Sequence, residues 1–120
     1  RQRGFPVLVA EVDGTVVGFA TYGDFRDSIA LPGYRFTVEH SVHVARGTLG
    51  GGIGRALLTE LMTHARNAGL HVMVGAIDAE NEASIGFHER LGFVETARMP
   101  QVGWKFGRWL DLVLMQRTIE

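Results

Sequence analysis

The sequence predicts a mixed α/β or α+β fold, with one central mixed sheet and flanking helices in the order β-β-β-α-β-α-β-β. Apolar, β-rich segments stand at both ends of the chain, and two internal segments have helical periodicity. Between these helices runs a nearly continuous apolar strand, which is typical of a strand covered on both faces. The chain has 120 residues, so we expect a single domain over 1–120.

Three strands are expected before the first helix. The first covers residues 5–12, and Asp13-Gly14 is a dipeptide that readily makes the hairpin turn to the second, over residues 15–22. Residues 23–34 contain Gly, Asp, Ser and Pro and predict a surface loop. A β-rich run over 35–44 completes this part of the sheet.

The first predicted helix covers residues 53–68. Ile53, Leu57, Leu61 and Ala65 recur every four residues, and Gly69 is placed to end the helix. These apolar residues form one stripe, so we expect the helix to pack against the sheet through that face.

The remaining elements are shorter. The apolar strand covers 70–77, and a weaker helix over 82–91 places Ala83, Phe87 and Leu91 on one face. The last strands are expected over 93–97 and 109–117. The segment between them mixes Pro, Gly and aromatic residues and predicts no regular element.

Composition excludes several classes of protein. The formal net charge of −1 removes the electrostatic argument for a nucleic acid or an anionic membrane as partner. No apolar stretch reaches the roughly 20 residues that span a bilayer, and the first residues do not resemble a signal peptide. Cysteine is absent, which rules out disulfides and thiolate metal sites and suits the cytoplasm. We expect no metal.

Glycine makes up 16 of the 120 residues, and five of the 16 lie between Gly47 and Gly54. This cluster follows a strand and opens a helix, so backbone N–H groups from about Gly50 to Arg55 can converge at the positive end of the helix dipole. Glycine also lets a pyrophosphate approach the backbone closely. The cluster predicts a phosphate site, and a flexible loop is the alternative.

Two common phosphate-binding motifs do not match the cluster. A Walker loop ends in Gly-Lys-Ser/Thr, whereas Gly54 is followed by Arg55 and Ala56. A dinucleotide fingerprint needs a third glycine where Leu57 stands. The pattern therefore disfavours both nucleoside triphosphate hydrolysis and dinucleotide binding.

Several segments together resemble the GNAT superfamily of N-acetyltransferases. They are the strand residues 42–44, the loop 50–55, Asn81 and the segment 87–93. Residues 37–42, 70–74 and 103–111 are similar to the phosphinothricin and methionine sulfoximine acetyltransferases in particular. The resemblance extends from about Phe5 to the end of the chain.

This resemblance implies the GNAT acyl-CoA N-acyltransferase fold, with acetyl-CoA as co-substrate. It also implies acetyl transfer by direct attack of the amino group of a small amino-acid-like substrate, of the phosphinothricin or methionine sulfoximine type. Two alternatives stay open: an acetyltransferase for a peptide N-terminus or another amine, and a non-catalytic CoA-binding module.

The resemblance also assigns roles to residues. Glu39 is the expected base, acting on the amine through water. His88 replaces a family tyrosine as the donor of a proton to the thiolate, for which an imidazole is suited near neutral pH. Asn81 is a cofactor contact, or an N-cap, or both. The expected cofactor-binding residues are Val42, His43, Val44, Gly50, Gly51, Gly52, Ile53, Gly54, Arg55 and Asn81, and the expected substrate contacts are Phe25, Arg26, Arg35, Glu39, His40 and Ser41.

Other histidines predict no metal site. His40 and His43 are an odd number of residues apart on a strand and should face opposite sides. His64 and His71 are expected on the surface. The aromatic segment around Trp104 and Trp109 either lines the acceptor site or packs in a homodimer.

Two departures from the family pattern stand out. Leu49 occupies a loop position where the family has Gln or Arg, which removes a polar side chain beside the pyrophosphate. The strand and two helices that open a GNAT domain have no counterpart before Phe5. From the second departure we expect a domain that lacks the usual N-terminal part.

Overall fold

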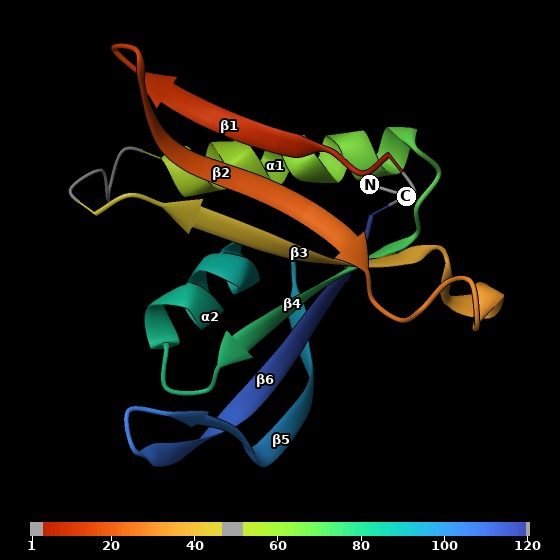
Figure 1. Cartoon of the computed structure of the whole chain (residues 1–120), viewed down its shortest axis with the longest axis vertical. Helices are drawn as coiled ribbons and strands as arrows, with labels where there is room; N and C mark the ends of the chain where they lie inside the picture. The colour runs from red at the N-terminus through yellow and green to blue at the C-terminus, as the bar shows by residue number, and fades with distance from the viewer. Residues whose placement is uncertain (1–3, 47–51, 120) are drawn as a thin grey trace.

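The computed structural model describes residues 4–46 and 52–119. Its six strands form one sheet in the order β1-β2-β3-β4-β6-β5. The elements are β1 (Val7–Val12), β2 (Thr15–Asp24), the 3-10 helix η1 (Pro32–Tyr34), β3 (Thr37–Val44), α1 (Ile53–Asn67), β4 (Val72–Asp78), α2 (Glu82–Arg90), β5 (Val94–Lys105) and β6 (Arg108–Thr118). The predicted mixed sheet with flanking helices is confirmed (Figure 1).

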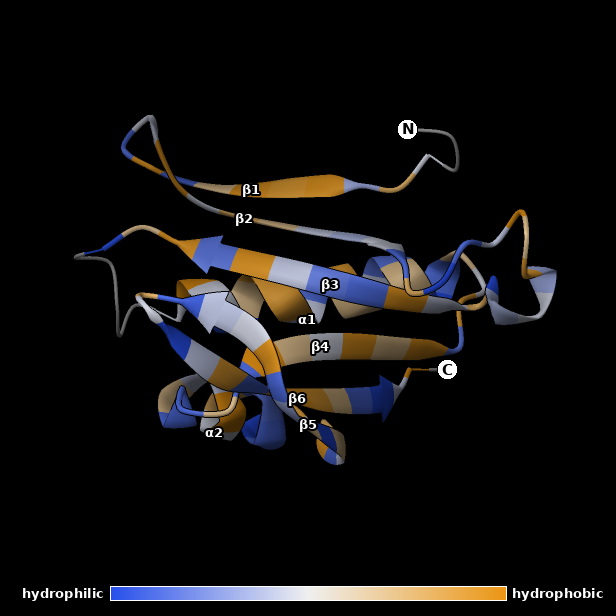
Figure 2. Ribbon diagram, turned by 60° about the horizontal axis from the view of Figure 1, so that its bottom comes forward, coloured by the Kyte–Doolittle hydropathy of each residue, from blue (hydrophilic) through white to orange (hydrophobic). Residues whose placement is uncertain are grey.

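All neighbouring strands are antiparallel except β3 and β4, which run parallel with α1 as the crossover between them. Both helices lie on the same face of the sheet. A Cβ on Gly18 of β2 would meet Leu57 of α1, and on the same face of β3 the ring of His40 stacks on His88 of α2. Figure 2 shows α1 beneath β1–β3 and α2 beside β4 and β6.

The core lies between α1 and the sheet, as the periodicity of the first helix predicts. Five residues of α1 are buried: Leu57, Leu58, Leu61, Met62 and Ala65. They join fully buried side chains of three strands and of the loop before β5, among them Val38, Met73, Val113 and Phe93. None of the helices in the described ranges is long and apolar enough to cross a membrane.

The hairpin turns follow the local sequence. Asp13 and Gly14 both have positive φ, as a type I′ turn requires, and so do Phe106 and Gly107 between β5 and β6. Most predicted element boundaries lie within two residues of the observed ones.

The end predicted for the fifth strand is wrong, because β5 continues to Lys105. Its pairing with β6 is irregular between Met99 and Gly103, and Gln101 there has a positive φ of 56°. This bulge takes in Pro100 and breaks the two-residue alternation from which a strand is recognised in sequence.

The face predicted for the second helix is confirmed only in part. Leu91, just past the helix, is buried in the core and Phe87 packs against the core partly buried, whereas Ala83 is exposed. The buried residue within α2 itself is His88. A helix normally buries apolar side chains, so this exception directs attention to the partner of His88.

The parallel pair β3–β4 is short, and this positions the site. Pairing covers only Thr37 to Glu39 of β3 and Val72 to Val74 of β4. Beyond Glu39 the two strands diverge, as Figure 1 shows. The first residues past the paired segment are His40 and Gly75, which lie at the apex of the opening.

Candidate active site in the opening between two strands

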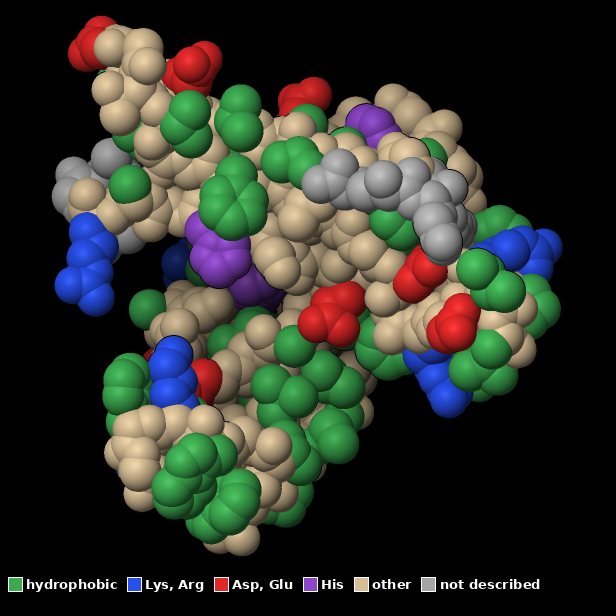
Figure 3. Space-filling view, in the orientation of Figure 1, with side chains coloured by type: hydrophobic (Ala, Val, Ile, Leu, Met, Phe, Trp, Pro, Cys, Tyr) green, Lys and Arg blue, Asp and Glu red, His purple; other side chains and the backbone are tan. Residues whose placement is uncertain are grey.

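A cleft of about 820 Å³ occupies the opening between β3 and β4. Its volume lies within the usual range for small-molecule sites. The space-filling view shows this side of the molecule hollowed, with histidine side chains at the edge of the hollow (Figure 3). The walls come from β3, the start of α1, the end of β4, and α2.

The cleft reaches both faces of the sheet. Successive side chains of a strand alternate between faces, and six successive residues of β3, from Glu39 to Val44, line the cleft. Glu39, Ser41 and His43 point to the face away from the helices, whereas His40 is buried on the helix side. The predicted opposition of His40 and His43 is confirmed.

The start of α1 forms one end of the cleft. Gly52 is its N-cap and has a φ of 74°, a conformation that favours glycine. Gly52, Ile53, Gly54 and Arg55 all line the cleft, and within the described residues no side chain caps the helix. The N–H groups of a first helical turn are suited to an anion. Gly47, Leu49, Gly50 and Gly51 lie outside the described residues.

Asn81 lies at the start of α2 and lines the cleft. Its Oδ1 accepts a hydrogen bond from the backbone N–H of Ser84, at 3.1 Å. The predicted N-cap is therefore present, on a residue that also lines the cleft.

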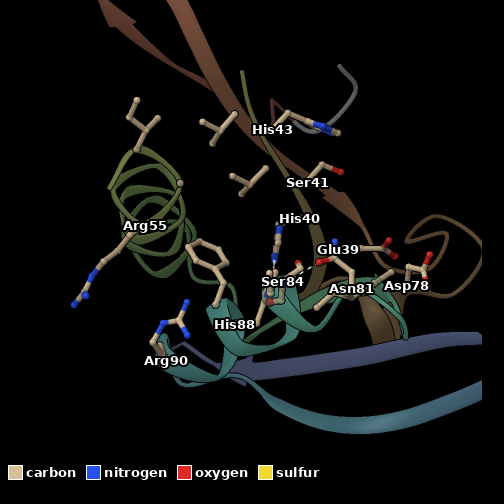
Figure 4. Close-up of a pocket in the computed structure, with 18 of the residues that line it drawn as sticks. Glu39, His40, Ser41, His43, Arg55, Asp78, Asn81, Ser84, His88 and Arg90 are labelled. Atoms are coloured by element: carbon tan, nitrogen blue, oxygen red, sulfur yellow. Dashed lines mark hydrogen bonds between the residues drawn. The ribbon is translucent and has the colours of Figure 1, made fainter. Parts of the chain in front are cut away.

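His88 is paired with His40. The Nε2 atoms of the two rings are 3.0 Å apart, and Nδ1 of His88 is 2.8 Å from the backbone oxygen of Ser84 (Figure 4). His40 is 7% exposed and His88 is 5% exposed. Burial lowers the pKa of His40 to about 3, with a smaller contribution from the charge of His88, and burial also lowers the pKa of His88. The pair is therefore uncharged at neutral pH.

Three of the expected substrate residues do not line this cleft. Phe25, Arg26 and Arg35 belong to the segment between β2 and β3. Arg26 lies over the ring of Tyr34 and Arg35 over the ring of Phe36, with guanidinium carbon to ring centroid distances of 4.8 Å and 4.4 Å. Within the described residues, the structure brings together Glu39, His40 and Ser41 but not these three.

The structure adds residues to which the sequence assigned no role in the site. Ser84, Phe87 and Arg90 bring α2 into the cleft wall, and Gly75 approaches the histidine pair closely. An isolated glycine in an otherwise apolar strand was a signal for Gly75, since such a glycine often marks a close approach. The pairing of His40 with His88 has no local signal, because 48 residues separate them.

Comparison with known proteins decides the family. Residues 1–93 match the model of the acetyltransferase (GNAT) family. The chain belongs to this family. The predicted family and fold are thereby confirmed, and this GNAT chain has the glycine-opened helix and the diverging strands at the place where its sequence resembles other members.

Named relatives narrow the comparison. An L-amino acid N-acyltransferase of Escherichia coli is 53% identical over 98% of this chain and 66% of its own length. An L-methionine sulfoximine/L-methionine sulfone acetyltransferase of Salmonella typhimurium is 53% identical, with coverages of 98% and 67%. A solved phosphinothricin acetyltransferase of Sinorhizobium meliloti in complex with acetyl-CoA has a TM-score of 0.90 at 39% identity, with coverages of 98% and 63%. The chain thus spans about two thirds of the length of these relatives.

Proposed function

We propose that this GNAT chain is an N-acetyltransferase that moves acetyl from acetyl-CoA to the amino group of a small amino-acid-like substrate, of the phosphinothricin or methionine sulfoximine type. The observation that carries the proposal is the cleft between β3 and β4, which reaches both faces of the sheet. Two reactants can therefore meet in it from opposite sides. The names of the relatives support the choice of reactants.

The helix side of the cleft suits acetyl-CoA. The first turn of α1 presents N–H groups from Gly52 onward for the pyrophosphate, and Arg55 adds a positive charge. Along residues 40–44 the edge of β3 that faces β4 has no strand partner within the ranges 4–46 and 52–119, because the pairing with β4 ends at Glu39. Backbone groups of Val42, His43 and Val44 are thus available to an extended pantetheine arm, much as a sheet edge receives an added strand.

The opposite side of the cleft suits the amine. Glu39 and Ser41 lie there on one face of β3. A substrate ammonium must lose a proton before its nitrogen can attack a thioester. We expect the Glu39 carboxylate, which lines the cleft, to take that proton through water. Bound acetyl-CoA supplies the thioester carbon that the amine attacks.

A thiol-release assay tests the proposal. The chain is incubated with acetyl-CoA and single amines: methionine sulfoximine, phosphinothricin, methionine sulfone, several natural amino acids and a peptide with a free N-terminus. We expect amine-dependent release of CoA with the small amino-acid analogues. Tight CoA binding without turnover of any amine would overturn the proposal and favour a binding module. Turnover of the peptide alone would overturn the choice of substrate.

We infer in addition that the chain acts as a homodimer in the cytoplasm. Trp104, Phe106 and Trp109 are exposed on the β5–β6 hairpin, by 61%, 86% and 57%. Exposed aromatic groups clustered in this way are typical of protein interfaces. The absence of cysteine suits a reducing compartment.

A further inference from the structure

The hydrogen bonds of the His40–His88 pair fix where each proton lies. The backbone oxygen of Ser84 can only accept, so Nδ1 of His88 carries a hydrogen and donates it. In a neutral imidazole the other nitrogen then has only a lone pair. Nε2 of His88 is therefore an acceptor, and Nε2 of His40 donates to it across 3.0 Å.

This arrangement of hydrogen atoms leaves one nitrogen of the pair with an unused lone pair. With its hydrogen on Nε2, His40 has a bare lone pair on Nδ1. That atom is buried and has no hydrogen-bond partner among the described residues. A buried polar atom without a partner costs free energy, which makes it a candidate for function.

The surroundings hold the pair rigidly at the apex of the cleft. The ring of Phe93 meets both imidazoles edge-on, with centroid distances of 5.6 Å to His40 and 5.2 Å to His88. Gly75 also lies so close that a Cβ there would be 3.0 Å from Nε2 of His40 and 3.2 Å from Nε2 of His88. Both histidines also line the cleft.

A neutral pair is poorly suited to the role that the sequence assigned to His88. A resting acid must hold a proton that it can release, and a neutral imidazole holds none that is acidic enough. Both nitrogens of His88 are also occupied by protein groups. A pair that starts neutral can, however, accept a proton and return it.

We propose that the His40–His88 pair is a proton relay, with Nδ1 of His40 as the atom at which the proton enters and leaves. His88 is then a positioning residue, which fixes the tautomer of His40 and stabilises the charge that His40 acquires. The proposal rests on the proposed acetyl transfer and deepens it.

The relay balances the protons of the reaction. When the amine nitrogen forms its bond to the thioester carbon, that nitrogen becomes positive. Its N–H bond breaks and the proton binds Nδ1 of His40, while the hydrogen on Nε2 of His40 stays bonded to Nε2 of His88. His88 stabilises the positive charge of His40 by accepting this hydrogen bond. When the carbon–sulfur bond breaks, the sulfur keeps the electron pair, and Nδ1 of His40 returns a proton to the sulfur.

The kinetics of three variants test the proton relay. In His40→Phe the nitrogen Nδ1 is lost, so we expect kcat to fall about 100-fold or more, with little change in the KM of acetyl-CoA. In His88→Gln the amide oxygen can still accept from Nε2 of His40, so we expect kcat to fall by less than about tenfold. This loss is smaller than the roughly 100-fold that removing a general acid or base typically costs. In the matched control His71→Gln, an exposed histidine, kcat should be unchanged.

Two kinetic results would overturn the relay. One is a kcat of His40→Phe close to that of the unaltered chain. The other is a loss in His88→Gln as large as in His40→Phe, which would make His88 itself the proton donor.

Imidazole ¹⁵N NMR of the chain without ligand tests the same proposal independently of activity. We expect His88 to carry its hydrogen on Nδ1 and His40 on Nε2, and we expect the tautomer of His40 to persist in His88→Gln. A hydrogen on Nδ1 of resting His40 would overturn the relay. If these tautomers are found but the unaltered chain turns over no amine, the proposed function fails and the relay falls with it. If His40→Phe still turns over the amine, the relay is wrong but the proposed function stands.

Discussion

Gly75 of β4 lies directly against the imidazole of His40 on β3. A Cβ added to Gly75 would stand 3.0 Å from Nε2 of His40, which is closer than about nine in ten real Cβ contacts. The two residues are the first beyond the paired segment of these parallel strands. A side chain at residue 75 would therefore press on both imidazoles at the apex of the cleft.

Replacing Gly75 by alanine tests this close packing. We expect Gly75→Ala to destabilise the chain by about 1–3 kcal/mol, because the methyl group overpacks a buried site, and to lower kcat by displacing the pair. Urea unfolding and the thiol-release assay measure the two effects. Gly23→Ala is the matched control, since a Cβ on this strand glycine meets nothing within 4 Å. Equal stability of the two variants would contradict the packing described here.

Acid should destabilise the fold through the same pair. The folded-state pKa of His40 is lowered to about 3 from an ordinary value of 6.5, and that of His88 is lowered as well. Between these values the unfolded chain binds more protons than the folded chain, so stability falls as pH drops below 6.5. The steepest slope is about 1.4 kcal/mol per pH unit for each histidine. Urea unfolding at several pH values measures it, and the double variant His40→Phe/His88→Phe should show a shallower dependence.

Asn81 permits its two expected roles to be separated. Asn81→Ala should cost about 1 kcal/mol of stability, because the N–H of Ser84 loses its cap. Asn81→Ser restores a capping oxygen and should recover that stability. If the amide of Asn81 also contacts the cofactor, both variants should bind CoA more weakly in calorimetric titration. Full CoA affinity in Asn81→Ser would limit Asn81 to capping.

Glu39→Gln tests the base on the amine side. The amide keeps the size of the side chain but cannot take a proton, so we expect kcat to fall about 100-fold, with the affinity for CoA unchanged. Glu89→Gln, on the exposed surface of α2, is the control and should retain full activity. A loss of CoA affinity in Glu39→Gln would instead place Glu39 on the cofactor side.

Phe106 tests the homodimer. The side chain stands at the tip of the β5–β6 turn and is 86% exposed. We expect the chain to sediment as a dimer and Phe106→Ser to shift it toward the monomer. Ile29→Ser replaces another apolar residue, 79% exposed, in the segment between β2 and β3, and should leave sedimentation unchanged. A monomeric unaltered chain would contradict the dimer directly.

The sequence by itself determined most of the elements and the family. The stripe from Leu57 to Ala65 requires one helix face on the sheet, and Asp13-Gly14 requires a tight turn, since both depend on neighbours in the chain. The sequence predicts too short a fifth strand, because the bulge at Met99 to Gly103 is stabilised by pairing with β6. The local sequence pattern contains no information about that pairing.

Only the tertiary structure decided the arrangement at the apex of the cleft. His40 is on a strand, His88 on a helix and Gly75 on a second strand, and each alone has an ordinary local environment. Their closeness arises where β3 and β4 diverge and α2 crosses the opening. Burial in that place lowers the pKa of both imidazoles and fixes their hydrogen bonds, because desolvation and partner geometry depend on contacts between distant segments.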